Sequence, residues 1–172
     1  MDGVMSYAEA YKIVAERNHL NYQMEATYEP YDETEILNER HDYREMIGDG
    51  NCVVRSVADQ FWENQELHDE VRQAGVARLI KFRELYEAVY EENPINGLSY
   101  DEYVRHIARP NVDIHPFFTQ AICDAYGVRI IEMVSDANYC IAEFTPTDGE
   151  VTATIRLISS SRHTDSMYLL DD

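Results

Sequence analysis

The chain has 172 residues, of which 45% are hydrophobic and 27% are charged, a composition that predicts a soluble globular protein of one domain. Its formal net charge is -19, from 33 acidic and 14 basic side chains. Nucleic acid is therefore not expected as a partner, because phosphate contacts need clustered Lys and Arg side chains. The acidic charge favours a partner with a basic face, although its benefit to solubility explains it equally well.

Three cysteines, Cys52, Cys123 and Cys140, form an odd set without a regular spacing, and no pattern of a zinc site accompanies them. We therefore expect no metal and no cofactor, and a reduced, intracellular protein of the cytoplasm or nucleus. The amino terminus lacks the basic segment and apolar run of a signal peptide. No apolar stretch approaches the ~20 residues of a membrane span. A single monomeric domain over residues 1–172 is the expected organisation.

The first two-thirds of the sequence have helical patterns. Ser6 and Glu9 have the spacing of a capping box, so residues 1–37 are expected to form an amino-terminal helical extension that contributes to substrate recognition. An acidic pair that begins at Asp32 predicts a second helix running toward Met46. A glycine-rich turn ends that helix.

Further helices are predicted from the turn to Gly127. One begins near Cys52, and the longest run covers residues 66–92. A capping box at Ser99 starts the next helix, and Pro116 lies where the first turn of the last one is expected. The residues expected on buried faces are Val53, Val57 and Phe61, then Val76, Leu79, Phe82, Tyr86 and Val89, and finally Phe118, Ala121, Ile122 and Ala125.

After Gly127 the pattern changes to short strands rich in β-branched and aromatic residues, separated by turn residues. Helices followed by a small, mostly antiparallel sheet make an α+β domain. The order of the strands is not predicted.

The stretch "GDGNC" places Cys52 directly after a glycine turn and at the start of a helix. Free backbone N–H groups and the helix dipole at that position favour a thiolate, and the same N–H groups can bind an oxyanion. A helix-capping loop that carries a buried cysteine is the competing interpretation. Cys123 and Cys140 fall inside a helix and a strand, where core thiols are expected.

A nucleophilic cysteine needs a base, and His163 is the candidate among the six histidines. It stands at the start of the last strand, and Asp165 follows two residues later on the same face. The carboxylate can fix the tautomer of the imidazole, whose other nitrogen can exchange a proton with Cys52. A histidine beside an aspartate on a strand is nevertheless common in proteins without catalysis.

The two stretches together resemble the signatures of one enzyme family. "GDGNCVVRSVADQ" (48–60) resembles the Gly-Asp-Gly-Asn-Cys motif of the OTU (ovarian tumour) cysteine proteases, and "HTDSMYLL" (163–170) resembles their closing segment. Residues 103–134 resemble the family's central helix and strand. The resemblance runs from about Asn38 to Leu170.

The resemblance implies a papain-like OTU fold and a deubiquitinase, with ubiquitin or polyubiquitin as partner. Such an enzyme hydrolyses the isopeptide or peptide bond at the carboxyl-terminal glycine of ubiquitin through a thioester. It implies Cys52 as nucleophile, His163 as general base and Asp165 as the residue that orients the base. The acidic charge then suits the arginine-containing tail and basic patch of the family's substrate.

The resemblance also implies roles for the residues before the cysteine. Asp49 would shape the loop, and the backbone N–H groups of Cys52 and of Gly50 or Asn51 would form the oxyanion hole. Two departures stand out. "PNVDIHPFF" (110–118) replaces the usual Trp-Gly, and Thr164 replaces the usual aromatic residue after the histidine.

Two alternatives remain open at the level of the sequence. One is an OTU-fold module that binds ubiquitin without turnover. The other is a cysteine protease that acts on another ubiquitin-like modifier or on a viral polyprotein.

Overall fold

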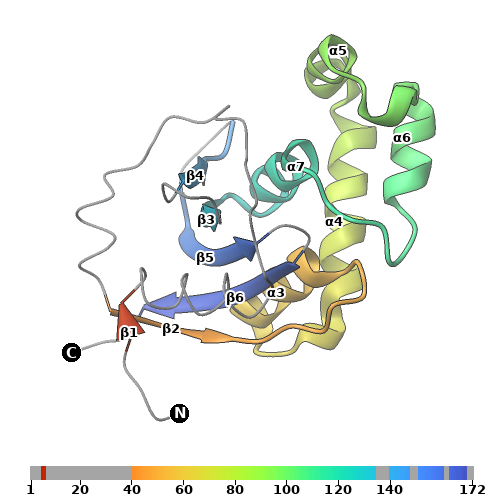
Figure 1. The fold of residues 1–172 in the computed structure, drawn as a ribbon. Coiled ribbons are helices and arrows are strands. Elements are labelled where there is room, and N and C mark those ends of the chain that lie inside the picture. The colour runs from red at the N-terminus through yellow and green to blue at the C-terminus, as the bar shows by residue number, and fades with distance from the viewer. Residues whose placement is uncertain (1–4, 7–39, 135–139, 148–150, 161–162, 170–172) are drawn as a thin grey trace.

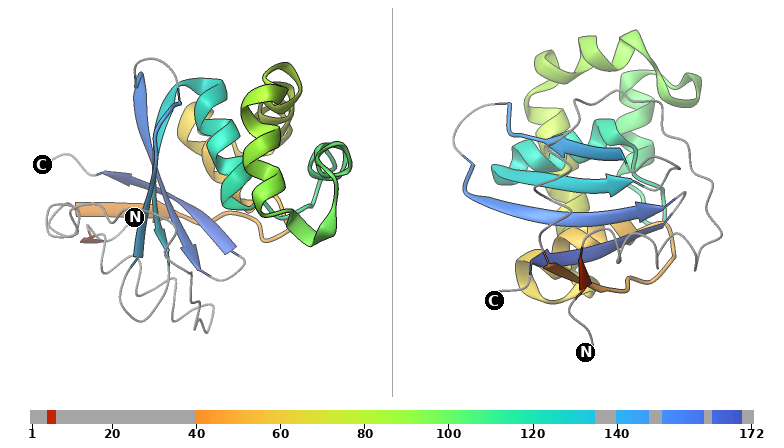
Figure 2. Two further views of the ribbon diagram at one scale, coloured as in Figure 1. Left: turned by 90° about the horizontal axis from the view of Figure 1, so that it is seen from above. Right: turned by 60° about the vertical axis from the view of Figure 1, so that its left-hand side comes forward.

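The structure is a computed structural model that describes residues 5–6, 40–134, 140–147, 151–160 and 163–169. One sheet of six strands in the order β1-β2-β6-β5-β3-β4 forms its centre, and helices cover one face of it (Figures 1 and 2). The strands are β1 (Met5–Ser6), β2 (Arg40–Arg44), β3 (Val128–Val134), β4 (Cys140–Phe144), β5 (Ala153–Ser160) and β6 (His163–Leu169). The β3–β5 pair is parallel and the other neighbours are antiparallel, so the predicted α+β class with a mostly antiparallel sheet is confirmed.

The helices are α3 (Cys52–Trp62), α4 (His68–Lys81), α5 (Arg83–Glu92), α6 (Tyr100–Ile107) and α7 (Pro116–Tyr126), with the short 3-10 turns η1 (Gln65–Leu67) and η2 (Ile95–Gly97). The predicted capping box is present at the start of α6, where the Ser99 hydroxyl accepts from the Glu102 N–H and the Glu102 carboxylate accepts from the Ser99 N–H. Pro116 begins α7, and Gly127 ends it in the left-handed conformation with φ 63°. These local signals predicted the start of α6 and both the start and the end of α7.

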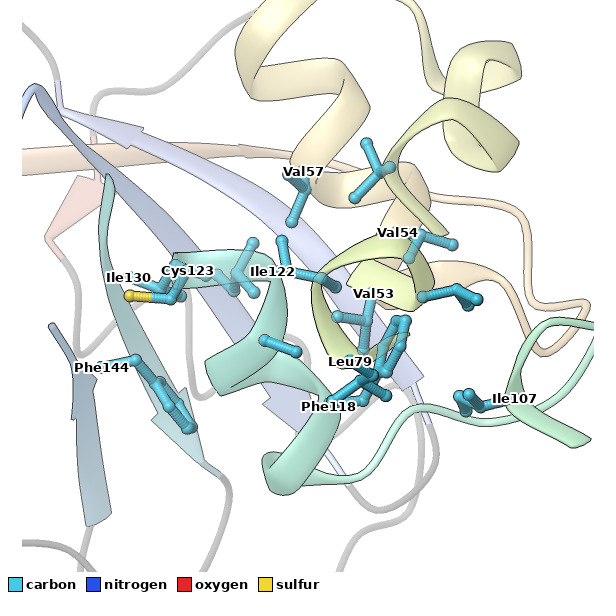
Figure 3. Close-up of a cluster of buried hydrophobic side chains, with 14 of the residues drawn as sticks. Val53, Val54, Val57, Leu79, Ile107, Phe118, Ile122, Cys123, Ile130 and Phe144 are labelled. Carbon is cyan, nitrogen blue, oxygen red and sulfur yellow. The ribbon is translucent and has the colours of Figure 1, made fainter. Parts of the chain in front are cut away.

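The hydrophobic core lies between the sheet and the helices (Figure 3). Helix α3 packs on β5 and β6, α7 packs on β3 and β4, and α4 packs over both helices. The core side chains drawn in Figure 3 include Val53, Val54, Val57, Leu79, Ile107, Phe118, Ile122, Cys123, Ile130 and Phe144. This packing fixes the start of α3 against the start of β6.

Two predictions about the amino-terminal part have different outcomes. The helix predicted toward Met46 is wrong over Arg40–Arg44, which is strand β2 and pairs antiparallel with β6. Its sequence, RHDYR, has no strand pattern, so the ladder with β6 decides its conformation. The helix predicted after Ser6 and the start at Asp32 lie outside the described residues.

The long helical run over residues 66–92 is also interrupted. Helix α4 ends at Lys81 and α5 begins at Arg83, with Phe82 between them at φ -112° and ψ 40°. The predicted apolar stripe therefore turns partly outward. Val76, Leu79 and Tyr86 are buried as predicted, whereas Phe82 and Val89 are exposed. Ala125, which was predicted on the buried face of α7, is exposed as well.

Within the described part of the chain, no helix is both long enough and apolar enough to cross a membrane.

Helices α4 and α7 approach each other at Gly75. A Cβ atom at Gly75 would lie 2.5 Å from Cζ of Phe118, whose side chain is fully buried. We expect Gly75→Ala to lower the free energy of unfolding by about 1–2 kcal/mol, because overpacking outweighs the gain in helix propensity. Urea denaturation measures the change.

Phe118→Leu supplies the matched background for this test, because it removes the ring atoms that the new methyl group meets. The cost of Gly75→Ala is expected to shrink in that background. A Gly75→Ala protein as stable as the parent would contradict the close packing of the two helices.

Candidate active site

The predicted nucleophile, Cys52, is the first residue of α3. The preceding Gly50 has φ +84°, and a Cβ atom there would lie 2.3 Å from the carbonyl oxygen of Asn111. Asn51 follows, and its carbonyl oxygen accepts from the Arg55 N–H at 2.7 Å, which is the first hydrogen bond of the helix. Both the positive φ and the close approach therefore require glycine at position 50.

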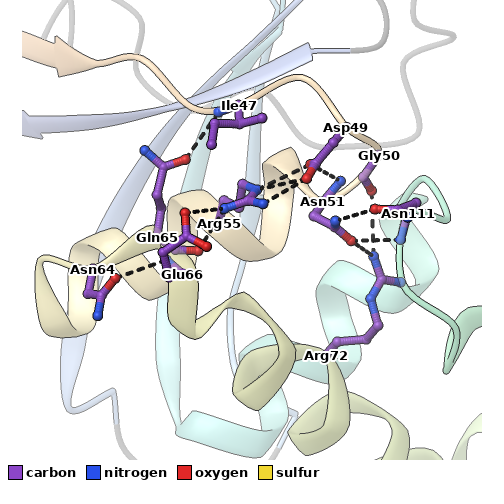
Figure 4. Close-up of polar contacts among 10 residues, drawn as sticks. All are labelled: Ile47, Asp49, Gly50, Asn51, Arg55, Asn64, Gln65, Glu66, Arg72 and Asn111. Atoms are coloured by element: carbon purple, nitrogen blue, oxygen red, sulfur yellow. Dashed lines mark hydrogen bonds and ion pairs between the residues drawn. The ribbon is translucent and has the colours of Figure 1, made fainter.

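Asp49 holds the turn through its carboxylate (Figure 4). One oxygen accepts from the Asn51 backbone N–H at 3.1 Å, and the Arg55 guanidinium donates to both oxygens at 2.7–3.3 Å. The hydrogen bond from Arg55 holds the pKa of Asp49 well below its usual range, and the bonds from Asn51 act in the same direction. The predicted role of Asp49 in shaping the loop agrees with these contacts.

Asn51 connects the loop to the segment after α6 (Figure 4). Its side-chain N–H donates to Asn111 Oδ1 at 2.7 Å, and its Oδ1 accepts from the Asn111 backbone N–H at 2.8 Å. Asn111 lies in the stretch "PNVDIHPFF" that departs from the family pattern. This departing segment therefore contacts the cysteine loop directly.

The side chain of Arg72 on α4 lies fully buried behind this loop. It donates to Asn51 Oδ1 at 3.0 Å and to the carbonyl oxygens of Ile107 and Val112 at 2.9 Å each. Burial lowers its pKa. Arg72 was not predicted as a site residue, although its spacing of four and seven residues from Val76 and Leu79 places it on the buried face of α4.

The side chain of Cys52 is buried, with 5% of its surface exposed. Burial raises the pKa of its thiol, hydrogen bonds from the backbone and side chain of Thr164 and from the Val53 N–H oppose this increase, and the field of Asp113 adds to it. The N–H group at the helix start thus favours the thiolate, as expected, while desolvation of the charged form acts in the opposite direction and is the larger effect.

His163 and Asp165 are joined at the start of β6. His163 Nε2 lies 2.6 Å from Asp165 Oδ1, and the same oxygen accepts from the Met46 backbone N–H at 2.9 Å. The Nδ1 edge of the ring faces the loop, because a Cβ atom at Gly48 would lie 3.6 Å from Nδ1. The structure thus brings the start of β6 beside the loop that ends at Cys52.

The oxyanion donors expected from the loop are not equally available. The Asn51 N–H is already bonded to the Asp49 carboxylate. The backbone N–H groups of Cys52 and Gly50 are therefore the remaining candidates for the donors of the oxyanion hole.

The other two cysteines differ from Cys52. Cys123 is fully buried in α7, and its thiol donates to the Val128 carbonyl oxygen at 2.8 Å, which confirms it as a core thiol. Cys140 begins β4, and its side chain lies outside the part that the structure describes.

Among the residues that the structure describes, no three or more His, Cys, Asp or Glu side chains are grouped so that they can hold a metal ion. A hollow of about 620 Å³ lies elsewhere, between α5, the start of α7 and the end of β4. The candidate site lies where the start of α3 meets the start of β6.

The fold and the site together define a papain-like α+β protein with a cysteine at a helix start and a His-Asp pair on a neighbouring strand. A family model described as OTU-like cysteine protease matches residues 47–148. The chain belongs to this family.

Curated relatives and a solved structure agree with the family. The chain is 32% identical over 99 residues to "OVARIAN TUMOR DOMAIN-containing deubiquitinating enzyme 9" of Arabidopsis thaliana, a match that covers 58% of this chain and 27% of that protein. It is 29% identical over 126 residues to enzyme 10 of the same series, covering 73% and 34%. The chain therefore matches about a third or less of the length of these relatives.

Among solved structures, that of the Hazara virus OTU bound to ubiquitin superposes with a TM-score of 0.64 at 16% sequence identity. The match covers 91% of this chain and 99% of that chain. At this identity the likeness concerns the fold, and it confirms the predicted OTU fold.

Replacing Arg72 tests the connection behind the cysteine loop. Arg72→Met keeps an apolar stem but removes the donors, so Asn51 Oδ1 keeps only the Asn111 N–H and the carbonyl oxygens of Ile107 and Val112 lose the guanidinium. We expect the free energy of unfolding to fall by about 3 kcal/mol, and Arg72→Lys to recover little of it because an ammonium lacks the planar fork. Urea denaturation measures both.

Arg105→Met is the matched control, because Arg105 is exposed on α6 and the same replacement there removes no buried partner. Equal stabilities of the Arg72→Met and Arg105→Met proteins would contradict the role given to the buried guanidinium.

Replacing Asp49 tests the charge in the turn. Since the pKa of Asp49 is lowered by folding, its ion pair stabilises the protein above the usual Asp range and the effect is lost as pH falls through the lowered value. We expect Asp49→Asn to destabilise by about 1 kcal/mol at neutral pH, since the pair is partly exposed, and the difference to narrow below about pH 4.

Denaturation curves of the two proteins between neutral and acidic pH measure this narrowing. Glu66→Gln serves as control, because Glu66 contacts the same guanidinium but its side chain is 69% exposed. A pH-independent difference between the parent and Asp49→Asn would show that the charge of Asp49 is not what holds the turn.

Proposed function

We propose that this chain is a cysteine-type deubiquitinase, which hydrolyses isopeptide or peptide bonds at the carboxyl-terminal glycine of ubiquitin. The observation that carries the proposal is the position of Cys52 at the start of α3, next to the β6 strand that begins with the bonded His163–Asp165 pair. The relatives are named deubiquitinating enzymes, and a solved structure of the same fold is bound to ubiquitin. Both findings support the proposal.

In the proposed reaction, Asp165 accepts from Nε2–H of His163, which leaves Nδ1 as the basic nitrogen. Nδ1 removes the proton of the Cys52 thiol as the sulfur attacks the carbonyl carbon of the ubiquitin glycine. Asp165 is held in turn by the Met46 N–H and stabilises the imidazolium that forms. The raised pKa of Cys52 agrees with a thiol that loses its proton during the reaction.

The tetrahedral oxyanion would then accept from the backbone N–H groups of Cys52 and Gly50. Its collapse expels the lysine amine, which takes the proton from His163, and leaves ubiquitin joined to Cys52 as a thioester. His163 next removes a proton from water, the resulting hydroxide attacks the thioester, and the cysteine is released with ubiquitin as a free acid.

The electrostatics of the chain suit such a substrate. A formal net charge of -19 attracts partners with a basic face and accelerates their encounter. We propose ubiquitin or polyubiquitin as the partner and an intracellular location for the protein.

The test uses a ubiquitin probe with an electrophilic carboxyl terminus. The parent protein is expected to form a covalent adduct on Cys52, identified by peptide mass spectrometry, and Cys52→Ala is expected to abolish both the adduct and cleavage of ubiquitin chains. Cys123→Ala is the control, since Cys123 is a buried thiol bonded within the core. It is expected to keep the adduct.

Chain cleavage by Cys52→Ala at the rate of the parent would refute the assignment of the nucleophile. Binding of ubiquitin without an adduct or cleavage by the parent would favour a binding module. If the parent protein reacts with probes made from other ubiquitin-like modifiers in preference to the ubiquitin probe, those modifiers would be its substrates.

A further inference from the structure

Asn51 occupies the position that normally caps a helix, yet its side chain does not cap α3. An asparagine directly before a helix usually accepts, through its side-chain oxygen, a hydrogen bond from a backbone N–H of the first turn. Between Asn51 and the described first turn of α3 there is no such bond. Its backbone has φ -106° and ψ 10°, close to the sparsely populated region in which many active-site residues lie. The residue that would ordinarily cover the N–H groups of this helix start therefore does not cover them.

The side chain of Asn51 is bound to Asn111 instead (Figure 4). Its Nδ2 donates to Asn111 Oδ1 at 2.7 Å, and its Oδ1 accepts from the Asn111 backbone N–H at 2.8 Å. Arg72 donates to the same Oδ1 at 3.0 Å. Asn51 is buried, so these hydrogen bonds have little competition from water. The three bonds keep the amide group of Asn51 on Asn111 and Arg72 rather than on the first turn of α3.

Asn111 has a backbone conformation that suits this pairing. Its φ is 65°, in the left-handed region that asparagine adopts more readily than most residues. Pro110 precedes it, and a proline followed by such a residue is typical of a turn. The carbonyl oxygen of Asn111 lies against Gly50, where a Cβ atom would be 2.3 Å away. Asn111 thus touches the cysteine loop twice, at Asn51 through two hydrogen bonds and at Gly50 through close contact.

The bonds of Asn51 also fix the direction of the N–H group that follows it. The Asn51 carbonyl oxygen accepts from the Arg55 N–H at 2.7 Å and therefore points into α3. The C=O and N–H groups of a trans peptide point in opposite directions, so the Cys52 N–H points out of the helix start. This N–H is one of the two donors proposed for the oxyanion. A rotation of the Asn51 backbone would turn both groups of this peptide together.

We propose that Asn111 is a positioning residue for the donors of the oxyanion hole. By binding the side chain of Asn51 and contacting Gly50, it sets the direction of the Gly50 and Cys52 N–H groups and keeps the Asn51 oxygen away from the helix start. This inference rests on the proposed function, in which an oxyanion forms at this place. Preorganised N–H donors at a helix start stabilise that negative charge more than the neutral carbonyl group of the substrate.

The experiment compares turnover with binding of a tetrahedral adduct in the full chain. Asn111→Gly adopts the positive φ without strain and keeps the backbone N–H, but it lacks the side-chain oxygen. Asn111→Asp keeps the oxygen and tolerates the same φ. The substrate is ubiquitin with a fluorogenic amide at its carboxyl terminus. The second ligand is ubiquitin aldehyde, to which the Cys52 thiol adds its sulfur at carbon and its proton at oxygen, so that this oxygen takes the place of the oxyanion.

We expect Asn111→Gly to lower kcat about tenfold with KM unchanged, a smaller loss than the roughly 10²–10³-fold that follows removal of a whole oxyanion donor. Its affinity for ubiquitin aldehyde is expected to fall by a similar factor, while its affinity for unmodified ubiquitin stays at the value of the parent. Asn111→Asp is expected to remain within about twofold of the parent in each measurement, because its oxygen still accepts from Asn51 Nδ2.

Asn96→Gly is the matched control. Asn96 is also an exposed asparagine with a positive φ, of 53°, but it lies on η2 outside the cysteine loop. The same replacement there is expected to leave kcat and the affinity for ubiquitin aldehyde unchanged. A parental kcat in Asn111→Gly, or equal losses in Asn111→Gly and Asn111→Asp, would overturn the proposal. A rise of KM without a change of kcat would overturn it as well, because it places the effect in the binding of the ground state.

A measurement without ubiquitin separates failure of this inference from failure of the proposed function. The ¹H–¹⁵N signals of Gly50 and Cys52 report the surroundings of the two N–H groups. Asn111→Gly is expected to shift both signals, and Asn96→Gly neither. Shifted signals, in a protein whose parent does not hydrolyse the ubiquitin substrate, would reject the function and keep the positioning role of Asn111. Unshifted signals would overturn the positioning role, whatever the activity of the parent.

Discussion

The buried guanidinium of Arg72 is the constraint on which the cysteine loop depends. A charge inside a protein must be surrounded by acceptors, and here they are Asn51 and the carbonyl oxygens of the segment from Ile107 to Val112. Because these acceptors belong to two separate segments, their hydrogen bonds to the two terminal nitrogens of Arg72 join the segments. Asn51 precedes Cys52 directly, so the position of the helix start and of its cysteine follows from this one buried charge.

The sheet positions the other part of the site, the His163–Asp165 pair. β2 and β6 are neighbours although they lie near opposite ends of the described chain, and the loop after β2 supplies the Met46 N–H to Asp165. The same loop continues to Cys52. One continuous segment, from Met46 to Cys52, therefore links the backbone N–H that holds Asp165 to the candidate nucleophile.

The ionisation of Cys52 shows which effect dominates when several compete. Donors from Thr164 and Val53 favour the thiolate, yet burial and the field of Asp113 raise the pKa of the thiol. Desolvation of the charged form therefore has a larger effect than the donors, and the proposed reaction needs a base, His163, that accepts the proton of the thiol.

The sequence by itself determined the elements whose signals are local. The capping box of α6, Pro116 and Gly127 around α7, the turn before Cys52 and the His163–Asp165 spacing act within a few residues, so all were predictable. The tertiary structure alone decided strand β2, the buried partners of Arg72 and the bond between the Met46 N–H and Asp165. Each depends on groups far apart in the chain, such as Met46 and Asp165, which are 119 positions apart, and their burial cannot be known before the chain folds.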